Sequence, residues 1–413
     1  MNRINCILLI GLTLLNGKFA HAQENVSKGD FVDISSDFAG GNVVVKSNSG
    51  AEVQIQPDLR TTPSEWPYWY FAAKANKPGV VTFQTPEIWG TRKAGALGNQ
   101  GPAISTDQGK TWKWMGTQNV TDHRFTYEFA KAGEEIRFSS SLPYVQADLD
   151  RFMSQNAGNS HVKKSVLTKS GKGRDVELIQ IGQEGPGILP VLVTGRQHAN
   201  ESVSSYVLEG FLQAAMSDTP AGEEFRKKYV MFAVPITDKD GVEEGDQGKN
   251  RKPHDHNRDW SDMPIYPETV ALMELDKQKD FKLAVDFHCP TLLMDTHQVI
   301  YFGGLKSPPP QNYENLKAFA KLVKEALPPG APGGPLLFSK PEPKKKENKH
   351  AHYFGYKEGA IMVCTLEFPY APAKAEMNID ALREYGKAIL DAWVKMEFVP
   401  YTPPTATEAP ATP

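Results

Sequence analysis

The sequence predicts an α/β protein in which an N-terminal antiparallel β-sandwich precedes an α/β/α domain with a mixed central sheet. Between Phe31 and Leu142, short β-branched or alternating runs are separated by Gly, Pro, Asn and Asp, which is typical of a sandwich. From Gly187 onward, strand-like apolar runs alternate with longer helical segments, which is typical of an α/β sheet. The length of 413 residues favours two domains over one.

The first domain is assigned to residues 23–150. Within it, the segment from Ser105 to Trp112 resembles an Asp-box hairpin turn, in which Asp107 caps the turn backbone and Gly109 takes a positive φ. One copy of this turn cannot build a propeller, so a structural role is expected. The clearest expected strands are Asn42–Val45, Tyr68–Ala73, Val80–Phe83 and Phe125–Phe129.

The second domain is assigned to residues 151–400. Its Pro-rich and Lys-rich segment from Pro328 to Lys349 is expected to form an exposed loop, and residues 401–413 to form a disordered Pro/Thr-rich tail. The expected strands are Ile188–Val193, Tyr229–Val234, Phe281–Phe287, Gln298–Phe302 and Ile361–Leu366. The expected helices are Glu201–Met216, Tyr266–Lys279, Asn312–Ala326 and Ala375–Met396.

The first 22 residues have the pattern of a secretory signal peptide. Arg3 precedes an apolar run from Ile4 to Leu15, and Ala20-His21-Ala22 matches a cleavage site. We therefore expect residues 1–22 to be removed from a protein exported to the periplasm or outside the cell. Later in the chain, no stretch approaches the roughly 20 consecutive apolar residues of a spanning helix, so we expect no membrane span.

The charge balance argues against a nucleic-acid partner. Lys and Arg total 46 against 49 Asp and Glu, and the net charge of −3 comes without a strongly basic block. A protein that binds a phosphate backbone depends on clustered basic side chains. The oligomeric state cannot be deduced from the sequence.

Three cysteines are too few for a disulfide scaffold. Cys6 belongs to the predicted signal peptide, whereas Cys289 and Cys364 lie at or within strands that we expect to be neighbours. A bridge requires Cα atoms within about 7 Å, so the sequence leaves both a single bridge and two buried free thiols open.

Three metal-binding side chains follow expected strands. His198 and Glu201 lie three residues apart just after Ile188–Val193, and His288 follows another apolar strand, next to Asp286, which is suited to orient its ring. Two imidazoles and a carboxylate with an open fourth position suit a catalytic zinc ion. His254 and His256 are alternative ligands, but a flexible loop with two histidines at i and i+2 is less suited to bind a metal ion than the ends of strands are.

Two further elements complete the candidate site. Glu367 follows the last apolar strand among Leu, Phe and Pro, where desolvation should raise its pKa toward the range of a general base. The loop from Gly248 to Trp260 combines Lys249, Arg251, Lys252, Arg258 and Asn257. Because Arg binds a carboxylate through two nitrogens, this loop is a candidate anion site.

These motifs together resemble the zinc carboxypeptidase family, also called the carboxypeptidase A-like metallopeptidases. Within this family, the resemblance is greatest to the cytosolic carboxypeptidase branch, in which a β-sandwich precedes the catalytic domain. The resemblance is carried by Leu189–Trp260, Asp286–His288 and Thr365–Glu367. It implies one Zn²⁺ per chain, bound by His198, Glu201 and His288.

The same resemblance implies the roles of the remaining site residues. Asp255, Asn257 and Arg258 match the family's Asp-x-Asn-Arg motif, in which Asn and Arg hold the substrate's C-terminal carboxylate. Arg251 matches an Arg that polarises the scissile carbonyl, and Glu367 matches the catalytic Glu.

The sequence also departs from the family pattern in two places. Lys239 stands where the family's V-P-x-x-N-P-D-G-V stretch has Pro. Where many members carry a substrate-covering Tyr some twenty residues before the base, this chain has none, and Tyr353 and Tyr356 are the nearest candidates.

The sequence thus predicts a metallocarboxypeptidase that hydrolyses the C-terminal peptide or isopeptide bond of a peptide with a free C-terminal carboxylate. Water activated by zinc attacks, with Glu367 as general base. Two alternatives are an N-acyl amino acid deacylase, similar to aspartoacylase and succinylglutamate desuccinylase, and a non-catalytic cell-surface binding module. The identity of the released residue is not readable from the sequence.

Overall fold

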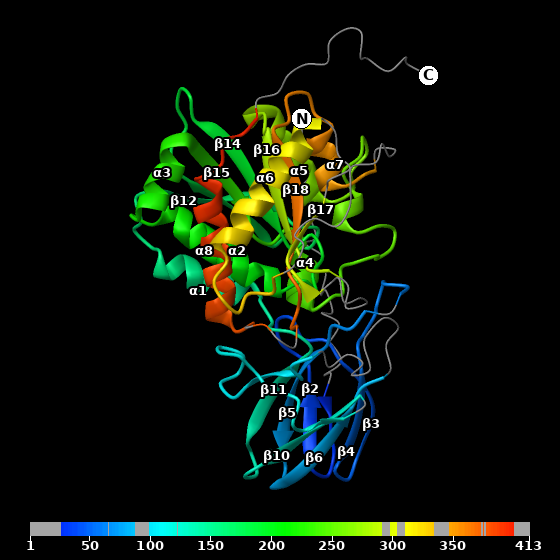
Figure 1. Ribbon diagram of the computed structural model, residues 1–413. Coiled ribbons are helices and arrows are strands. Elements are labelled where there is room, and N and C mark those ends of the chain that lie inside the picture. The colour runs from blue at the N-terminus through cyan, green and yellow to red at the C-terminus, as the bar shows by residue number, and fades with distance from the viewer. Residues whose placement is uncertain are drawn as a thin grey trace, which may run out of the picture.

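The computed structural model describes residues 26–64, 66–86, 99–121, 123–290, 298–303, 310–333, 347–372, 375 and 377–399. The predicted signal peptide, the C-terminal tail and most of the predicted Pro328–Lys349 loop lie outside these residues. Two sheets form the N-terminal part and a mixed sheet between helices forms the rest (Figure 1), which confirms the predicted fold class.

The N-terminal sheets pack their apolar faces against each other. Phe71, Phe83, Phe125 and Phe138 form the centre of this core, with ring centroids 4.8 to 5.6 Å apart. Adjacent strands are antiparallel except β4 and β6, which are parallel. One sheet has the order β1 (Val26–Ser27), β2 (Val32–Ser35), β5 (Tyr70–Ala75), β11 (Glu135–Ser139), β7 (Ala103–Ser105), β8 (Lys113–Trp114). The other has the order β3 (Val44–Ser49), β4 (Glu52–Gln56), β6 (Gly79–Gln84), β10 (Arg124–Phe129), β9 (Val120–Thr121).

The Asp-box turn joins β7 to β8, as its sequence predicts. Asp107 Oδ1 accepts hydrogen bonds from the backbone N–H groups of Lys110 and Thr111 at 3.0 and 2.9 Å. Gly109 has a φ of +85°, which is favourable for glycine. The turn is therefore a structural element of the sandwich.

The mixed sheet of the second part has parallel strands at its centre and antiparallel strands at its edges. Its order is β12 (Val162–Lys169), β13 (Asp175–Ile181), β15 (Tyr229–Val234), β14 (Leu189–Gly195), β16 (Leu283–His288), β18 (Met362–Glu367), β17 (Tyr301–Gly303). β15, β14, β16 and β18 run parallel, so their carboxyl ends meet at one edge. That edge is where open α/β sheets place ligand sites.

Helices cover both faces of this sheet. Side chains alternate along the strands, so Val191 and Val193 enter the core beneath α2, whereas Leu192 packs toward α5 and α7. The helices are α1 (Gln146–Gln155), α2 (Val203–Met216), α3 (Pro220–Lys228), α4 (Lys239–Glu244), α5 (Pro267–Lys279), α6 (Pro310–Ala326), α7 (His350–Gly355) and α8 (Ile379–Trp393). Among the described residues, no helix is both long and apolar enough to cross a membrane.

Lys239, the departure from the family pattern, forms a buried ion pair. It is 2% exposed, and its ammonium lies 2.6 Å from Glu177 Oε2 in β13. The charge that replaces the usual Pro is thus compensated by a carboxylate from a neighbouring strand.

The two parts of the chain are joined by hydrogen bonds to two loops of the second part. Asn42 Nδ2 donates to Gly245 O at 2.7 Å, and Gln247 Nε2 donates to Tyr68 O at 2.8 Å. Trp114 Nε1 donates to Met377 O at 2.9 Å. The sandwich therefore supports both the basic loop and the segment that follows β18.

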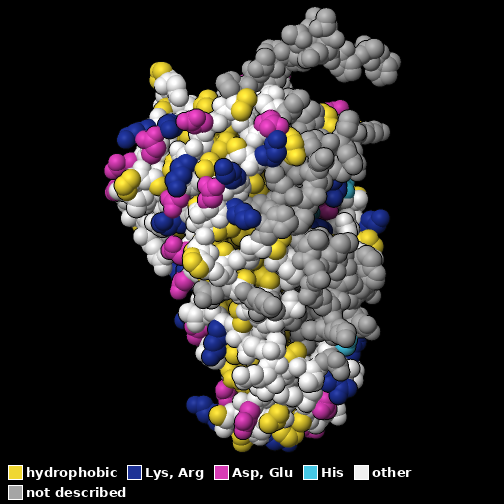
Figure 2. Space-filling model, in the orientation of Figure 1, with side chains coloured by type: hydrophobic (Ala, Val, Ile, Leu, Met, Phe, Trp, Pro, Cys, Tyr) yellow, Lys and Arg dark blue, Asp and Glu magenta, His cyan; other side chains and the backbone are white. Residues whose placement is uncertain are grey.

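The surface seen in Figure 2 carries both signs of charge. Among the described residues on this face, basic and acidic side chains are interspersed without a large patch of one sign. This distribution agrees with the absence of a strongly basic block in the sequence.

Helices α2 and α8 approach each other at two glycines. A Cβ on Gly210 would overlap the carbonyl oxygen of Arg383, and a Cβ on Gly386 would overlap that of Val207. Since α2 begins two residues after Glu201, this contact fixes the helix that follows a candidate metal ligand.

We expect Gly210→Ala to lower the free energy of unfolding by about 1 to 3 kcal/mol, because the added methyl must displace backbone in a closely packed contact. Thermal unfolding of the full chain measures this effect. Gln213→Ala, at an exposed position of the same helix, is the control and should change stability by no more than about 0.5 kcal/mol. Equal stability of the two variants would contradict the close approach of α2 and α8.

Candidate metal centre

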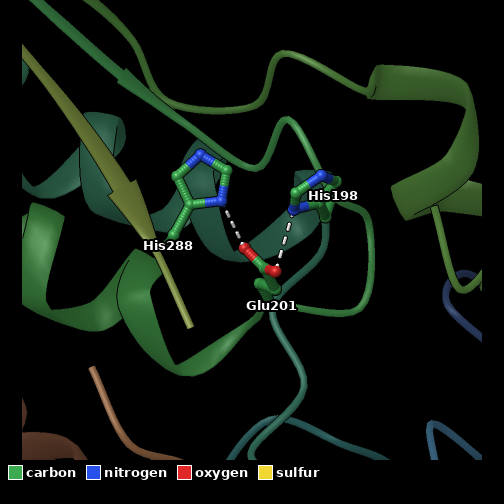
Figure 3. Close-up of side chains that lie close together, drawn as sticks. All are labelled: His198, Glu201 and His288. Carbon is green, nitrogen blue, oxygen red and sulfur yellow. Dashed lines mark hydrogen bonds and ion pairs between the residues drawn. The ribbon is translucent and has the colours of Figure 1, made fainter. Parts of the chain in front are cut away.

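Three candidate ligands meet where β14 and β16 end. The two strands pair in parallel with Gly195 opposite Phe287, which brings the turn after β14 beside His288, the last residue of β16. Ligand atoms of His198, Glu201 and His288 all lie within 4.8 Å of one another, and all three residues are buried. In Figure 3, the Glu201 carboxylate lies between the two imidazole rings.

Glu201 is the centre of this cluster and is completely buried. Its Oε1 lies 2.9 Å from His198 Nδ1 and 2.8 Å from Lys249 Nζ, and its Oε2 lies 2.7 Å from His288 Nδ1. Burial alone would raise the pKa of Glu201, but attraction by His198, Lys249 and His288 holds that pKa well below its ordinary value. The carboxylate is therefore ionised and able to act as a ligand.

Carboxylates on the far side of each ring orient the two histidines. His288 Nε2 lies 2.5 Å from Asp286 Oδ2, and His198 Nε2 lies 3.4 Å from Asp255 Oδ1. Each ring thus turns its Nδ1 toward Glu201. Two oriented imidazole nitrogens, a carboxylate and supporting carboxylates form a donor set that fits zinc.

Glu367 is the last residue of β18 and the Cα partner of His288. Its Oε2 is buried and has no hydrogen-bond partner among the residues that the structure describes. Burial raises the pKa of Glu367, and His288 and Lys249 oppose this rise. A partly desolvated carboxylate beside a candidate metal site has the properties of a proton acceptor.

Lys249 is the cation of the basic loop that reaches the cluster. Burial would lower its pKa, but the charges of Glu201 and Glu367 outweigh burial and raise it, so the ammonium stays charged. The guanidinium of Arg251 instead binds Asp238 and lies 3.7 Å from Asp246. The structure thus brings Lys249 to the cluster and pairs Arg251 elsewhere. The family resemblance had pointed to Arg251, and not to Lys249, for the role beside the catalytic Glu.

Asn257 and Arg258 lie on the same loop, in a short 3₁₀ helix at His256–Arg258. Asn257 Oδ1 accepts a hydrogen bond from the His350 backbone N–H at 3.1 Å, which holds the amide in place. Arg258 is exposed, and its Nη1 donates to Asn257 O at 3.0 Å. Asp255 connects this segment to the cluster through His198.

The alternative ligands His254 and His256 do not join the cluster. His254 Nε2 binds Asp259 Oδ1 at 2.7 Å, and the His256 ring stacks on Tyr266 with centroids 3.8 Å apart. Both rings belong to the packing of the loop.

The two tyrosines considered as substrate covers lie in or next to α7. Tyr353 packs against Trp260 with ring centroids 5.4 Å apart, and Tyr356 lies 5.5 Å from the His352 ring. Tyr301, which the sequence analysis did not consider, is the Cα partner of Glu367 across β17 and β18. Burial and the Glu367 charge both raise the pKa of Tyr301.

Cys289 and Cys364 are buried free thiols. Cys364 pairs with Val285, four residues before Cys289, so the two side chains are not cross-strand neighbours. The structure therefore contains no bridge between them.

Residues 149–333 match the family model "Zinc carboxypeptidase". Cytosolic carboxypeptidase 2 of Xenopus tropicalis is 25% identical over 297 residues, covering 62% of this chain and 30% of that protein. Cytosolic carboxypeptidase 6 of Caenorhabditis elegans is 23% identical over 276 residues, covering 60% of this chain and 59% of that protein. The chain thus spans less than two thirds of the length of these relatives.

Two solved structures share the fold of nearly the whole chain. A metallo-carboxypeptidase from Pseudomonas aeruginosa, in complex with (2-guanidinoethylmercapto)succinic acid, has a TM-score of 0.74 at 18% identity, covering 87% of this chain and 98% of that one. A metallo-carboxypeptidase from Burkholderia cenocepacia has a TM-score of 0.71 at 19% identity, covering 88% and 98%. The similarity in both cases includes the N-terminal sandwich as well as the second part.

These comparisons contradict the predicted location. The curated relatives are named cytosolic carboxypeptidases, so the prediction of export to the periplasm or outside the cell is wrong. They also favour neither the deacylase nor the non-catalytic binding module.

His288→Ala removes a nitrogen donor from the cluster, so we expect the purified variant to lose stoichiometric zinc while it remains folded. Elemental analysis measures the zinc, and thermal unfolding checks the fold. His254→Ala is the matched control, because its ring pairs with Asp259 away from the cluster, and it should retain one zinc per chain. Zinc loss from His254→Ala combined with retention by His288→Ala would contradict this ligand set.

Proposed function

We propose that the chain is a zinc-dependent metallocarboxypeptidase that removes the C-terminal residue of a peptide, because residues 149–333 match the zinc carboxypeptidase family. The observation that supports this function best is the meeting of His198, Glu201 and His288 at the strand ends, with Glu367 opposite His288. The family match ends at residue 333, so the assignment of Glu367 depends on its position in the sheet.

In this proposal, His198, Glu201 and His288 would hold the zinc ion, and the Nδ1 atoms of both imidazoles face the Glu201 carboxylate. Bound zinc lowers the pKa of water and polarises the scissile carbonyl. Glu367 accepts a proton from the attacking water and delivers it to the leaving amine. Its raised pKa suits the first step, because a carboxylate that binds a proton more tightly is a better base.

Lys249 takes the role that the resemblance gives to Arg251. Its ammonium lies at the cluster, 2.8 Å from Glu201 Oε1, whereas Asp238 neutralises Arg251. A fixed positive charge there stabilises the negative charge that develops on the scissile carbonyl oxygen.

Asn257 and Arg258 hold the terminal carboxylate of the substrate. Arg258 offers a forked guanidinium, and the Asn257 amide is held by His350. This anchor limits attack to the last bond of the chain and so makes the enzyme an exopeptidase. A peptide with a free C-terminal carboxylate is the proposed substrate.

Glu367→Gln preserves the shape of the side chain but removes the base. We expect kcat to fall by about 10² or more while zinc remains bound. Digestion of a peptide library, followed by mass spectrometry of the released residues, measures activity and identifies the preferred C-terminal residue. Full activity of Glu367→Gln would exclude Glu367 as the proton acceptor.

The exopeptidase assignment is tested with one peptide in free and C-terminally amidated forms. The wild type should cleave only the free form efficiently, and Arg258→Ala should raise KM for the free form and reduce this preference. Equal cleavage of both forms by the wild type would show that the site is not anchored at a terminal carboxylate.

Lys249→Met keeps most of the stem of the side chain and removes its charge. We expect kcat to fall by about 10² to 10³, the range found when one stabilising donor is removed from an oxyanion site. Arg251→Met, measured alongside, should have the smaller effect on kcat. The reverse order would return this role to Arg251.

A further inference from the structure

One aromatic side chain of the N-terminal sandwich part reaches the catalytic cluster. The Lys249 ammonium lies 5.1 Å from the centroid of the Trp66 ring and 2.8 Å from Glu201 Oε1. Lys249 therefore bridges the indole of one part of the chain and a candidate metal ligand of the other. An ammonium within about 6 Å of an indole is attracted by its π electrons.

Backbone and side-chain contacts fasten the segment around Trp66 to the loop that carries Lys249. Thr62 Oγ1 donates to Lys249 O at 3.4 Å, and the Lys252 N–H donates to Thr61 O at 3.1 Å. Trp66 Nε1 donates to Ser64 Oγ at 3.0 Å, which fixes the indole relative to this segment. The loop is thus held at Lys249 and at Lys252.

Lys249 needs such support because of its chemistry. The lysine side chain is a flexible four-carbon chain. Its ammonium group lacks the planar fork of donors that orients an arginine guanidinium. Glu201 is also a candidate metal ligand, so a bound cation competes with Lys249 for the same carboxylate. The indole face is a partner for which the metal does not compete.

We propose that Trp66 is a positioning residue, which holds the Lys249 ammonium at the catalytic centre through its ring face. The inference rests on the proposed function. It makes the N-terminal sandwich part a contributor to catalysis through one side chain.

The test compares Trp66→Leu with Trp66→Phe in the zinc-loaded full chain, with the preferred free-C-terminus peptide as substrate. Leu keeps an apolar side chain but has no π face, so kcat should fall by about 3- to 30-fold with little change in KM. Phe retains a ring face and should restore most of kcat. In a Lys249→Met background, Trp66→Leu should change kcat by less than about twofold, because its effect acts through Lys249.

Trp112→Leu is the matched control, because its partly buried indole belongs to the same sandwich part and packs on Tyr70. It should leave kcat unchanged. Any of three results would overturn the inference. Trp66→Leu could leave kcat unchanged, or it could raise KM without lowering kcat. It could also lower kcat by the same factor in the wild-type and Lys249→Met backgrounds. If the wild type releases no C-terminal residue, the proposed function itself fails, and the two failures are thereby distinguished.

Discussion

The negative charge of Glu201, removed entirely from water, is the constraint around which the site is arranged. A buried carboxylate is stable only when neighbouring charges and hydrogen bonds replace its hydration. Here two imidazoles, one ammonium and the backbone N–H of Cys289 at 3.1 Å perform that function. They come from three separate segments of the chain, so the charge can be accommodated only when the strands and the basic loop are in register.

That register is set by rigid elements on both sides of the carboxylate. Parallel pairing of β14, β16 and β18 aligns the turn at His198, the end of β16 and Glu367. The glycine contact with α8 fixes α2, which follows Glu201. Ligands on strand ends and helix starts are held more precisely than ligands on mobile loops.

The sequence predicted the two-part architecture and the three residues that meet in the cluster, because each of them follows a strongly apolar strand. It missed β12, because Val162–Lys169 is an exposed edge strand that includes three lysines and lacks an apolar alternation. It also missed β13 (Asp175–Ile181), although that strand contains buried apolar residues. The family resemblance pointed to Arg251 for the catalytic role, whereas the structure brings Lys249 to Glu201. Both are basic residues of one loop, and only the tertiary fold decides which is neutralised by Asp238 and which reaches Glu201.

The order of strands in the mixed sheet has a consequence for biosynthesis. β14 and the turn with His198 and Glu201 are translated early, but β16 lies beside β14, and β18 lies beside β16. Helix α8, which packs against α2, comes last among the described elements. On the ribosome the Glu201 carboxylate therefore remains without its full set of partners until β16 and Cys289 have emerged, and Glu367 joins the cluster only after β18 has been synthesised.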